Sequence, residues 1–311
     1  MSQPTLLVTA ADLAPQALAL LEDFNIVYAG KTPTEEDIVT LCRTHDPVAI
    51  IMRYSKVGAA AMEAAPSLRV ISKHGSGTDT IDKAAAAARG IEVRAAVGAN
   101  AAAVAEHALA LLLACAKSVP HMDARMHAGH WDKATHRSVE LAGRTIALVG
   151  LGAIGLRFAR MAQAMDMRVI GHDPYARDLP ACVQAVDLDT VWREADAISL
   201  HCPLTDGNRN LLDAATLSRC KRGVIVVNTA RGGLIEEAAL LAAVQSGQVG
   251  AAGLDSFAVE PMTVPHPFHN QAGFILSPHI GGVTRDAYIN MGMAAARNVL
   301  AVLESRLATQ A

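Results

Sequence analysis

Short apolar runs rich in β-branched residues alternate with helical patterns along almost the whole chain, and this alternation constrains the fold more than any other feature. Before residue 97 the expected strands are Thr5–Thr9, Asn25–Ala29, Val48–Tyr54, Arg69–Lys73 and Ile91–Ala95. The helices expected between them are Pro15–Glu22, Thr34–Arg43, Gly58–Ala64 and Thr80–Arg89. This ordering predicts a parallel sheet that is covered by helices on both faces.

A second series of the same kind follows residue 100. It begins with a long apolar helical pattern over Ala101–Lys117, which is followed by a polar connection through His136. The expected strands are Thr145–Val149, Met167–His172, Ala197–His201, Gly223–Asn228, Gly250–Asp255 and Phe274–Leu276. The chain closes with a helical pattern over Asp286–Leu307. With 311 residues and about 150 residues per domain, the sequence predicts two α/β domains, each with a doubly wound parallel sheet.

Composition and charge exclude several classes of protein. Hydrophobic residues make up 51% of the chain and charged residues 18%, which excludes a disordered protein. The net charge is only −3, with both signs spread along the chain, so neither nucleic acid nor a membrane surface is an expected partner. The five cysteines form no CxxC pair, and the N-terminus lacks the basic region of a secretory signal. We therefore expect a soluble cytoplasmic protein.

A glycine-rich turn lies between the expected strand Thr145–Val149 and a helical pattern. The first glycine of a GxGxxG turn permits tight bending, the second lets the backbone approach a pyrophosphate, and the third allows close packing of helix on strand. The helix N-terminus then offers free N–H groups to phosphate oxygens. The residues expected to bind a dinucleotide here are Gly150, Gly152, Ala153, Ile154 and Gly155.

Asp173 follows the next expected strand, 18 residues after Gly155. A carboxylate at this place binds the adenosine ribose hydroxyls and disfavours a 2′-phosphate, which predicts NAD rather than NADP. The alternative is an ordinary turn residue before Pro174. Arg177 lies close enough to weaken the exclusion of NADP.

Seven sequence blocks together resemble the D-isomer-specific 2-hydroxyacid dehydrogenase family, on its phosphoglycerate dehydrogenase-like side. No single block carries the resemblance, but all seven occur in the order of the family. The blocks are Lys73–Asp79, Asn100–His107, Gly150–Gly155, Leu200–Leu204, Val227–Gly233, Gly253–Phe257 with Glu260–Pro261, and Ser277–Gly282.

The resemblance implies a fold, a cofactor and a reaction. The implied fold has an NAD-binding Rossmann domain, residues 97–284, inserted into a flavodoxin-like substrate domain, residues 1–96 and 285–311. The implied reaction moves a hydride between NAD(H) and C2 of a small D-2-hydroxy acid or 2-keto acid, in a homodimer. Further residues that the resemblance assigns to cofactor binding are Cys202, Pro203, Thr229, Ala230 and Asp255, of which Asp255 would receive the nicotinamide carboxamide.

Three residues are candidates for catalysis. Reduction of a ketone needs a fixed cation for the substrate carboxylate and carbonyl, and a proton donor that titrates near neutral pH. Arg231 ends an expected strand, and its planar fork suits a carboxylate. His279 follows another strand and has a suitable pKa range. Glu260 resembles the acid that orients this histidine, and an anionic neighbour would keep the imidazole protonated.

The candidate substrate residues lie in the first domain. Ser76 and Gly77 resemble the loop whose N–H groups bind the substrate carboxylate, and Asn100 belongs to a neighbouring block. Arg53, Lys56 and Lys73 follow expected strands of the same domain, which hints at a substrate with a second anionic group; each alone is typical of solvated surface charge.

The sequence leaves some alternatives open. Hydroxypyruvate, glyoxylate, 3-phosphoglycerate and longer 2-keto acids all suit the motifs. A corepressor-like scaffold that senses NAD without significant turnover is the alternative from another class, whereas Glu260 disfavours formate dehydrogenases, which have glutamine there. Apart from His279, no histidine has a convincing acid or cysteine partner at ligand spacing, so no metal site is expected.

Overall fold

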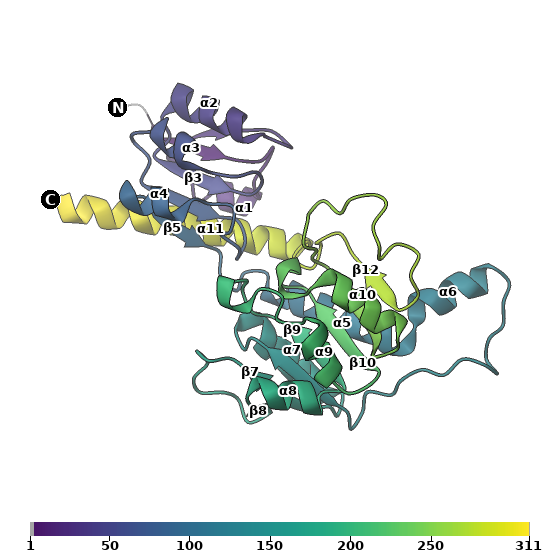
Figure 1. The fold of residues 1–311 in the computed structure, drawn as a ribbon. Coiled ribbons are helices and arrows are strands. Elements are labelled where there is room, and N and C mark those ends of the chain that lie inside the picture. The colour runs from purple at the N-terminus through teal and green to yellow at the C-terminus, as the bar shows by residue number, and fades with distance from the viewer. Residues whose placement is uncertain (1–2, 311) are drawn as a thin grey trace. The chain divides into compact units, whose positions relative to one another are not determined.

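The computed structural model describes residues 3–310, with side chains described through Arg306. Its residues form two compact units (Figure 1). The first unit contains the chain up to Asn100 together with the segment from Val283 onward, and the second contains Ala101–Gly282. Each unit contains one sheet in which every pairing between named strands is parallel. The fold class expected from the sequence is therefore confirmed.

The first unit has a five-stranded sheet in the order β2-β1-β3-β4-β5. The strands are β1 Thr5–Val8, β2 Asn25–Tyr28, β3 Ala49–Met52, β4 Val70–Lys73 and β5 Glu92–Ala95. The helices are α1 Pro15–Leu18, α2 Glu35–His45, α3 Ala59–Glu63, α4 Lys83–Ala88 and the long C-terminal α11 Arg285–Gln310.

Both faces of this first sheet are buried, and the alternation of side chains along β1 shows how. Leu6 and Val8 pack in one core cluster with Val299 of α11, whereas Leu7 packs in a second cluster with Ile38 of α2. A strand covered on both faces reads as a continuous apolar run, which explains the pattern of the sequence.

The second unit has a seven-stranded sheet in the order β12-β11-β10-β9-β6-β7-β8. Its strands are β6 Thr145–Val149, β7 Arg168–His172, β8 Val183–Ala185, β9 Ala197–Leu200, β10 Val224–Asn228, β11 Val249–Leu254 and β12 Phe274–Leu276. Its α-helices are α5 Ala101–Lys117, α6 Val119–His127, α7 Ala153–Ala164, α8 Leu188–Glu194, α9 Ala214–Arg219 and α10 Glu237–Gln245.

The strand order of this second sheet reverses between β6 and β9. The chain runs outward from β6 through β7 to β8 and then returns to β9 on the other side of β6. Open α/β sheets bind ligands at the carboxyl ends of the strands at such a switch point. The glycine-rich turn follows β6, and Cys202 and Pro203 follow β9, so the expected nucleotide residues lie at this edge.

Sequence analysis located most elements and missed β8. β6, β12 and α5 have the expected bounds, but the helix expected over Pro15–Glu22 ends at Leu18. The expected polar connection after α5 contains α6, the helix on which His121 and His127 lie and none of whose residues is buried. β8 was not expected, because it has only three residues, of which Val183 alone is buried, too few for a periodic pattern.

No single helix among residues 3–310 combines the length and apolar character of a membrane span; α5 and α6 would do so only as a pair, and they meet at a bend of 61°. In the same described part of the chain, no group of three or more His, Cys, Asp or Glu side chains could hold a metal ion.

Candidate active site

The glycine-rich turn has the geometry that a pyrophosphate requires. Gly150 has φ +100°, and a Cβ there would lie 2.6 Å from the amide N of Cys202. A Cβ on Gly155 would lie 2.2 Å from the carbonyl O of Gly150. A Cβ on Gly152 would meet nothing within 4 Å, and no side chain caps α7 at this residue. Open space beside an uncapped helix N-terminus suits the phosphates of NAD.

Asp173 lies against this turn, directly after β7. One carboxylate oxygen accepts a hydrogen bond from the amide of Leu151 (2.9 Å), and the other accepts from the amide of Tyr175 (2.9 Å). Each carboxylate oxygen has a second acceptor position, which is available in principle to ribose hydroxyls. The contacts of Asp173 therefore also agree with the alternative interpretation, in which it is an ordinary turn residue before Pro174.

The residues expected to contact the cofactor after β9 and β10 are Cys202, Pro203, Thr229 and Ala230. Burial raises the pKa of the Cys202 thiol to about 11, so this cysteine is neutral at physiological pH. The hydroxyl oxygen of Thr229 is buried and has no hydrogen-bond partner among the described residues. Thr229 follows β10, at the same carboxyl-end edge of the sheet as the glycine-rich turn, and an unpaired buried hydroxyl there is a group that a bound ligand can satisfy.

Arg231 lies on a segment with very close backbone packing. Its Nη1 donates to the carbonyl of Ala230 (2.7 Å), and its own carbonyl accepts from the side chain of Asn228 (2.9 Å). A Cβ on Gly232 would come within 1.9 Å of the carbonyl carbon of Phe257. Only glycine allows the Arg231 segment to rest on this peptide.

His279 and Glu260 are in direct contact. The imidazole Nδ1 lies 2.7 Å from Oε2 of Glu260, and Oε1 of Glu260 accepts from the amide of Phe257 (2.9 Å). This hydrogen bond from His279 to Glu260 raises the pKa of His279 above its ordinary value, in spite of partial burial. Burial of the Glu260 carboxyl opposes its ionisation, but the bonds from His279 and Phe257 outweigh it and lower the pKa of Glu260.

Asp255 holds the loop that carries His279. Its side chain is 2% exposed, and its oxygens accept from the hydroxyl of Ser277 (2.6 Å) and from the amides of Ile280 (2.9 Å) and Gly281 (2.7 Å). The Ser277 hydroxyl also contacts Nε2 of His107 (2.8 Å). Sequence reasoning assigned Asp255 to the nicotinamide carboxamide and gave Ser277 and His107 no role, because this network joins segments far apart in the sequence.

The candidate substrate residues of the first unit form two groups. The hydroxyl of Ser76, on an exposed loop with Gly77, lies 3.3 Å from the side-chain oxygen of Asn100. Arg53 makes an ion pair with Asp12 (2.5 Å).

Two aromatic rings and a lysine complete the surroundings of Arg53. Its guanidinium lies over the rings of Tyr54 and Tyr288, at 5.1 and 4.8 Å from their centroids. Lys73 donates to the carbonyl of Arg53 (2.8 Å), whereas Lys56 is exposed. Two of the three expected cations are thus engaged within their own unit.

Comparison with known proteins identifies the family. The model of the D-isomer specific 2-hydroxyacid dehydrogenase NAD binding domain matches residues 109–281. The chain belongs to this family. It is an NAD-dependent 2-hydroxyacid oxidoreductase, and NAD is its cofactor.

Individual relatives of this dehydrogenase act on different acids. A hydroxypyruvate reductase of Thermotoga maritima is 40% identical over 248 residues, which cover 79% of this chain and 81% of the relative. A D-3-phosphoglycerate dehydrogenase of Mycobacterium tuberculosis is 37% identical over 96% of this chain, which spans only 57% of that longer protein. The structure of a glyoxylate reductase from Paecilomyes thermophila matches with a TM-score of 0.88 and 27% identity, covering 98% of this chain and 96% of the other.

The glycine-rich turn of the dehydrogenase generates a paired prediction. Gly152→Ala should leave the thermal midpoint unchanged, because its Cβ meets no protein atom, yet raise the Kd for NADH at least about tenfold, or about 1.4 kcal/mol. Gly150→Ala should destabilise the fold by at least about 2 kcal/mol through its positive φ and its clash. Calorimetry and NADH fluorescence titration measure both. Unchanged NADH binding in Gly152→Ala would refute the assigned phosphate position.

The same titration with NADPH tests Asp173. Its carboxylate should make NADPH a weaker ligand than NADH, and Asp173→Ala should reduce the difference between the two Kd values. Equal affinity of the unmodified protein for the two cofactors would remove Asp173 from cofactor selection.

The contact between Glu260 and His279 generates a pH prediction. If protonated His279 is the active form in keto-acid reduction, activity is lost as the pH rises through its pKa. Glu260→Gln removes the charge that raises this pKa, so the midpoint of the loss should move down by roughly one pH unit. The measurement is kcat/KM across the pH range, and a profile that overlays the wild type would contradict the assignment.

Proposed function

We propose that this dehydrogenase reduces a small monoanionic 2-keto acid of the hydroxypyruvate or glyoxylate kind to the D-2-hydroxy acid. The observation that carries the proposal is the hydrogen bond of His279 to Glu260, which keeps a proton on the imidazole. Bound NADH supplies the hydride that the carbonyl carbon accepts.

Each of the three candidate catalytic residues has a separate role. The guanidinium of Arg231 binds the substrate carboxylate and carbonyl oxygen, which gains negative charge in the transition state. His279 donates its proton to this oxygen. Glu260 stabilises the imidazolium before the transfer and orients the ring through Nδ1, so that Nε2 faces the substrate.

The surroundings of Arg53 support the choice of a substrate without a second charge. An additional phosphate would have to compete with Asp12, whose carboxylate already forms an ion pair with the guanidinium. The hydroxyl of Tyr288 also donates to Asp12 (2.9 Å), which holds that carboxylate in place. The relatives named hydroxypyruvate reductase and glyoxylate reductase agree with this choice, whereas 3-phosphoglycerate is the competing substrate.

A panel of keto acids tests the proposal. Hydroxypyruvate and glyoxylate should give a higher kcat/KM than 3-phosphohydroxypyruvate in NADH oxidation. His279→Ala should reduce turnover roughly 10²–10⁴-fold, the usual contribution of a general acid, with NADH affinity retained. Preference for the phosphorylated acid would overturn the substrate class, and full activity of His279→Ala would overturn the mechanism.

We also propose that the enzyme is a homodimer that associates through α6 and the loop after it. This segment exposes apolar side chains, of which Trp131 is 76% exposed, and Val119 and Met126 are also exposed. Exposed apolar patches of this kind mark interaction surfaces. Trp131→Glu should give a monomer by light scattering, and Tyr175→Glu, at an 87% exposed aromatic elsewhere in the second unit, should not. A monomeric wild type would contradict the proposal.

A further inference from the structure

Two successive peptide groups, one on each side of Phe257, are held from three sides. Glu260 accepts the N–H of Phe257 (2.9 Å), and Oε1 of Glu237 accepts the N–H of Ala258 (2.8 Å). The backbone of Gly232 covers the second of these peptides, between Phe257 and Ala258, since a Cβ there would lie 2.1 Å from the carbonyl oxygen of Phe257. These two successive peptide groups therefore join the Arg231 segment, the start of α10 and the loop that carries Glu260.

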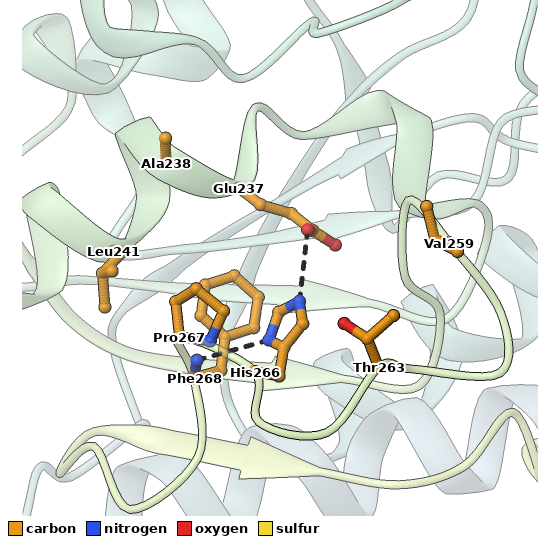
Figure 2. Close-up of a pocket in the computed structure, with 8 residues that line it drawn as sticks. All are labelled: Glu237, Ala238, Leu241, Val259, Thr263, His266, Pro267 and Phe268. Atoms are coloured by element: carbon orange, nitrogen blue, oxygen red, sulfur yellow. Dashed lines mark hydrogen bonds and ion pairs between the residues drawn. The ribbon is translucent and has the colours of Figure 1, made fainter.

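His266 contacts the other carboxylate oxygen of Glu237. Its Nε2 lies 3.5 Å from Oε2 of Glu237, and its side chain is 11% exposed. The amide of Phe268 donates to Nδ1 of His266 (3.3 Å), so in the neutral ring the proton is on Nε2 and faces Glu237. Figure 2 shows this pair at a hollow of about 410 Å³ that α10 and the loop before β12 enclose.

We propose that Glu237 is a positioning residue that holds the Glu260 loop so that Glu260 stays on His279. Glu260 binds an amide of its own loop, so that bond does not anchor the loop to anything else. Glu237 supplies the external anchor, because it begins α10, whose Leu240 is fully buried in the core of the second unit. The proposal builds on the assignment of His279 as proton donor, although the contact itself does not depend on that assignment.

A simpler role for Glu237 would be to stabilise the positive end of α10, where acidic residues are favourable. Glu236 separates the two roles, because it lies in the same turn, carries the same charge and is exposed. Glu236→Ala is therefore the matched control for Glu237→Ala. Both variants remove one charge from the start of α10, but only Glu237→Ala removes the acceptor of the Ala258 amide.

The test is an NMR titration of the His279 imidazole in the cofactor-free protein, with the signal assigned through His279→Ala. The other charged groups that act on this imidazole are Glu260, Asp255 and Arg231, and none of them is changed. Glu237→Ala should lower the pKa of His279 by roughly 0.5 to 1 unit, within the spread of histidines in folded proteins. Glu236→Ala should leave it unchanged.

Combination with Glu260→Gln gives the decisive comparison. In that background Glu237→Ala should cause no further fall in the pKa of His279, since the carboxylate of Glu260 that Glu237 positions is absent. An unchanged pKa in Glu237→Ala, or an equal fall in both backgrounds, would overturn the proposal. Glu237→Gln keeps an acceptor oxygen and should stay near the wild-type pKa; a fall as large as that of Glu237→Ala would likewise overturn it.

If Glu237→Ala does not fold, Glu237→Asp carries the same test, because it keeps the charge but shortens the reach to Ala258. The titration involves no turnover, so its result stands apart from the proposed function. Retained activity in His279→Ala would sink the proton-donor assignment, whereas the pKa comparison decides the positioning role alone.

Discussion

The carboxylate of Glu260 is shared between two donors, the imidazole of His279 and the amide of Phe257, and the proposed chemistry of the site depends on this sharing. A carboxylate in contact with a histidine raises the imidazole pKa only while the two groups stay within hydrogen-bond reach. One oxygen of Glu260 therefore contacts His279, and the other accepts a hydrogen bond from the backbone of the loop that carries Glu260. The position of that loop becomes as important as the identity of the acid.

Close backbone contacts fix several loop positions in this unit. Gly232 lets the Arg231 segment lie on the Phe257 peptide, and Gly150 lets the cofactor turn lie on the start of the segment after β9. Asp255 adds two amide contacts that hold the backbone at Ile280 and Gly281, next to His279. Preorganised donors and acceptors of this kind cost no rearrangement during the reaction.

Much of this organisation could be predicted from the sequence, and there is a physical reason why the remaining contacts could not. The strand–turn–helix context of Gly150 to Gly155 is local, so periodicity and glycine spacing suffice to predict it. The contacts of Ser277 with His107 and of Arg53 with Asp12 join residues 170 and 41 positions apart, and nothing in either local pattern indicates them. The role proposed for Glu237 could not be predicted either, because an acidic residue at the start of a helix is favourable in itself.

In the proposed reaction, protonated His279 meets the carbonyl oxygen of a 2-keto acid. Binding of oxamate, an unreactive isostere of pyruvate, to the NADH-saturated enzyme tests this before any chemistry occurs. The Kd should be constant below the pKa of His279 and should rise about tenfold per pH unit above it, and this rise should be absent in His279→Ala. An oxamate affinity that is independent of pH in the wild-type enzyme would contradict the account.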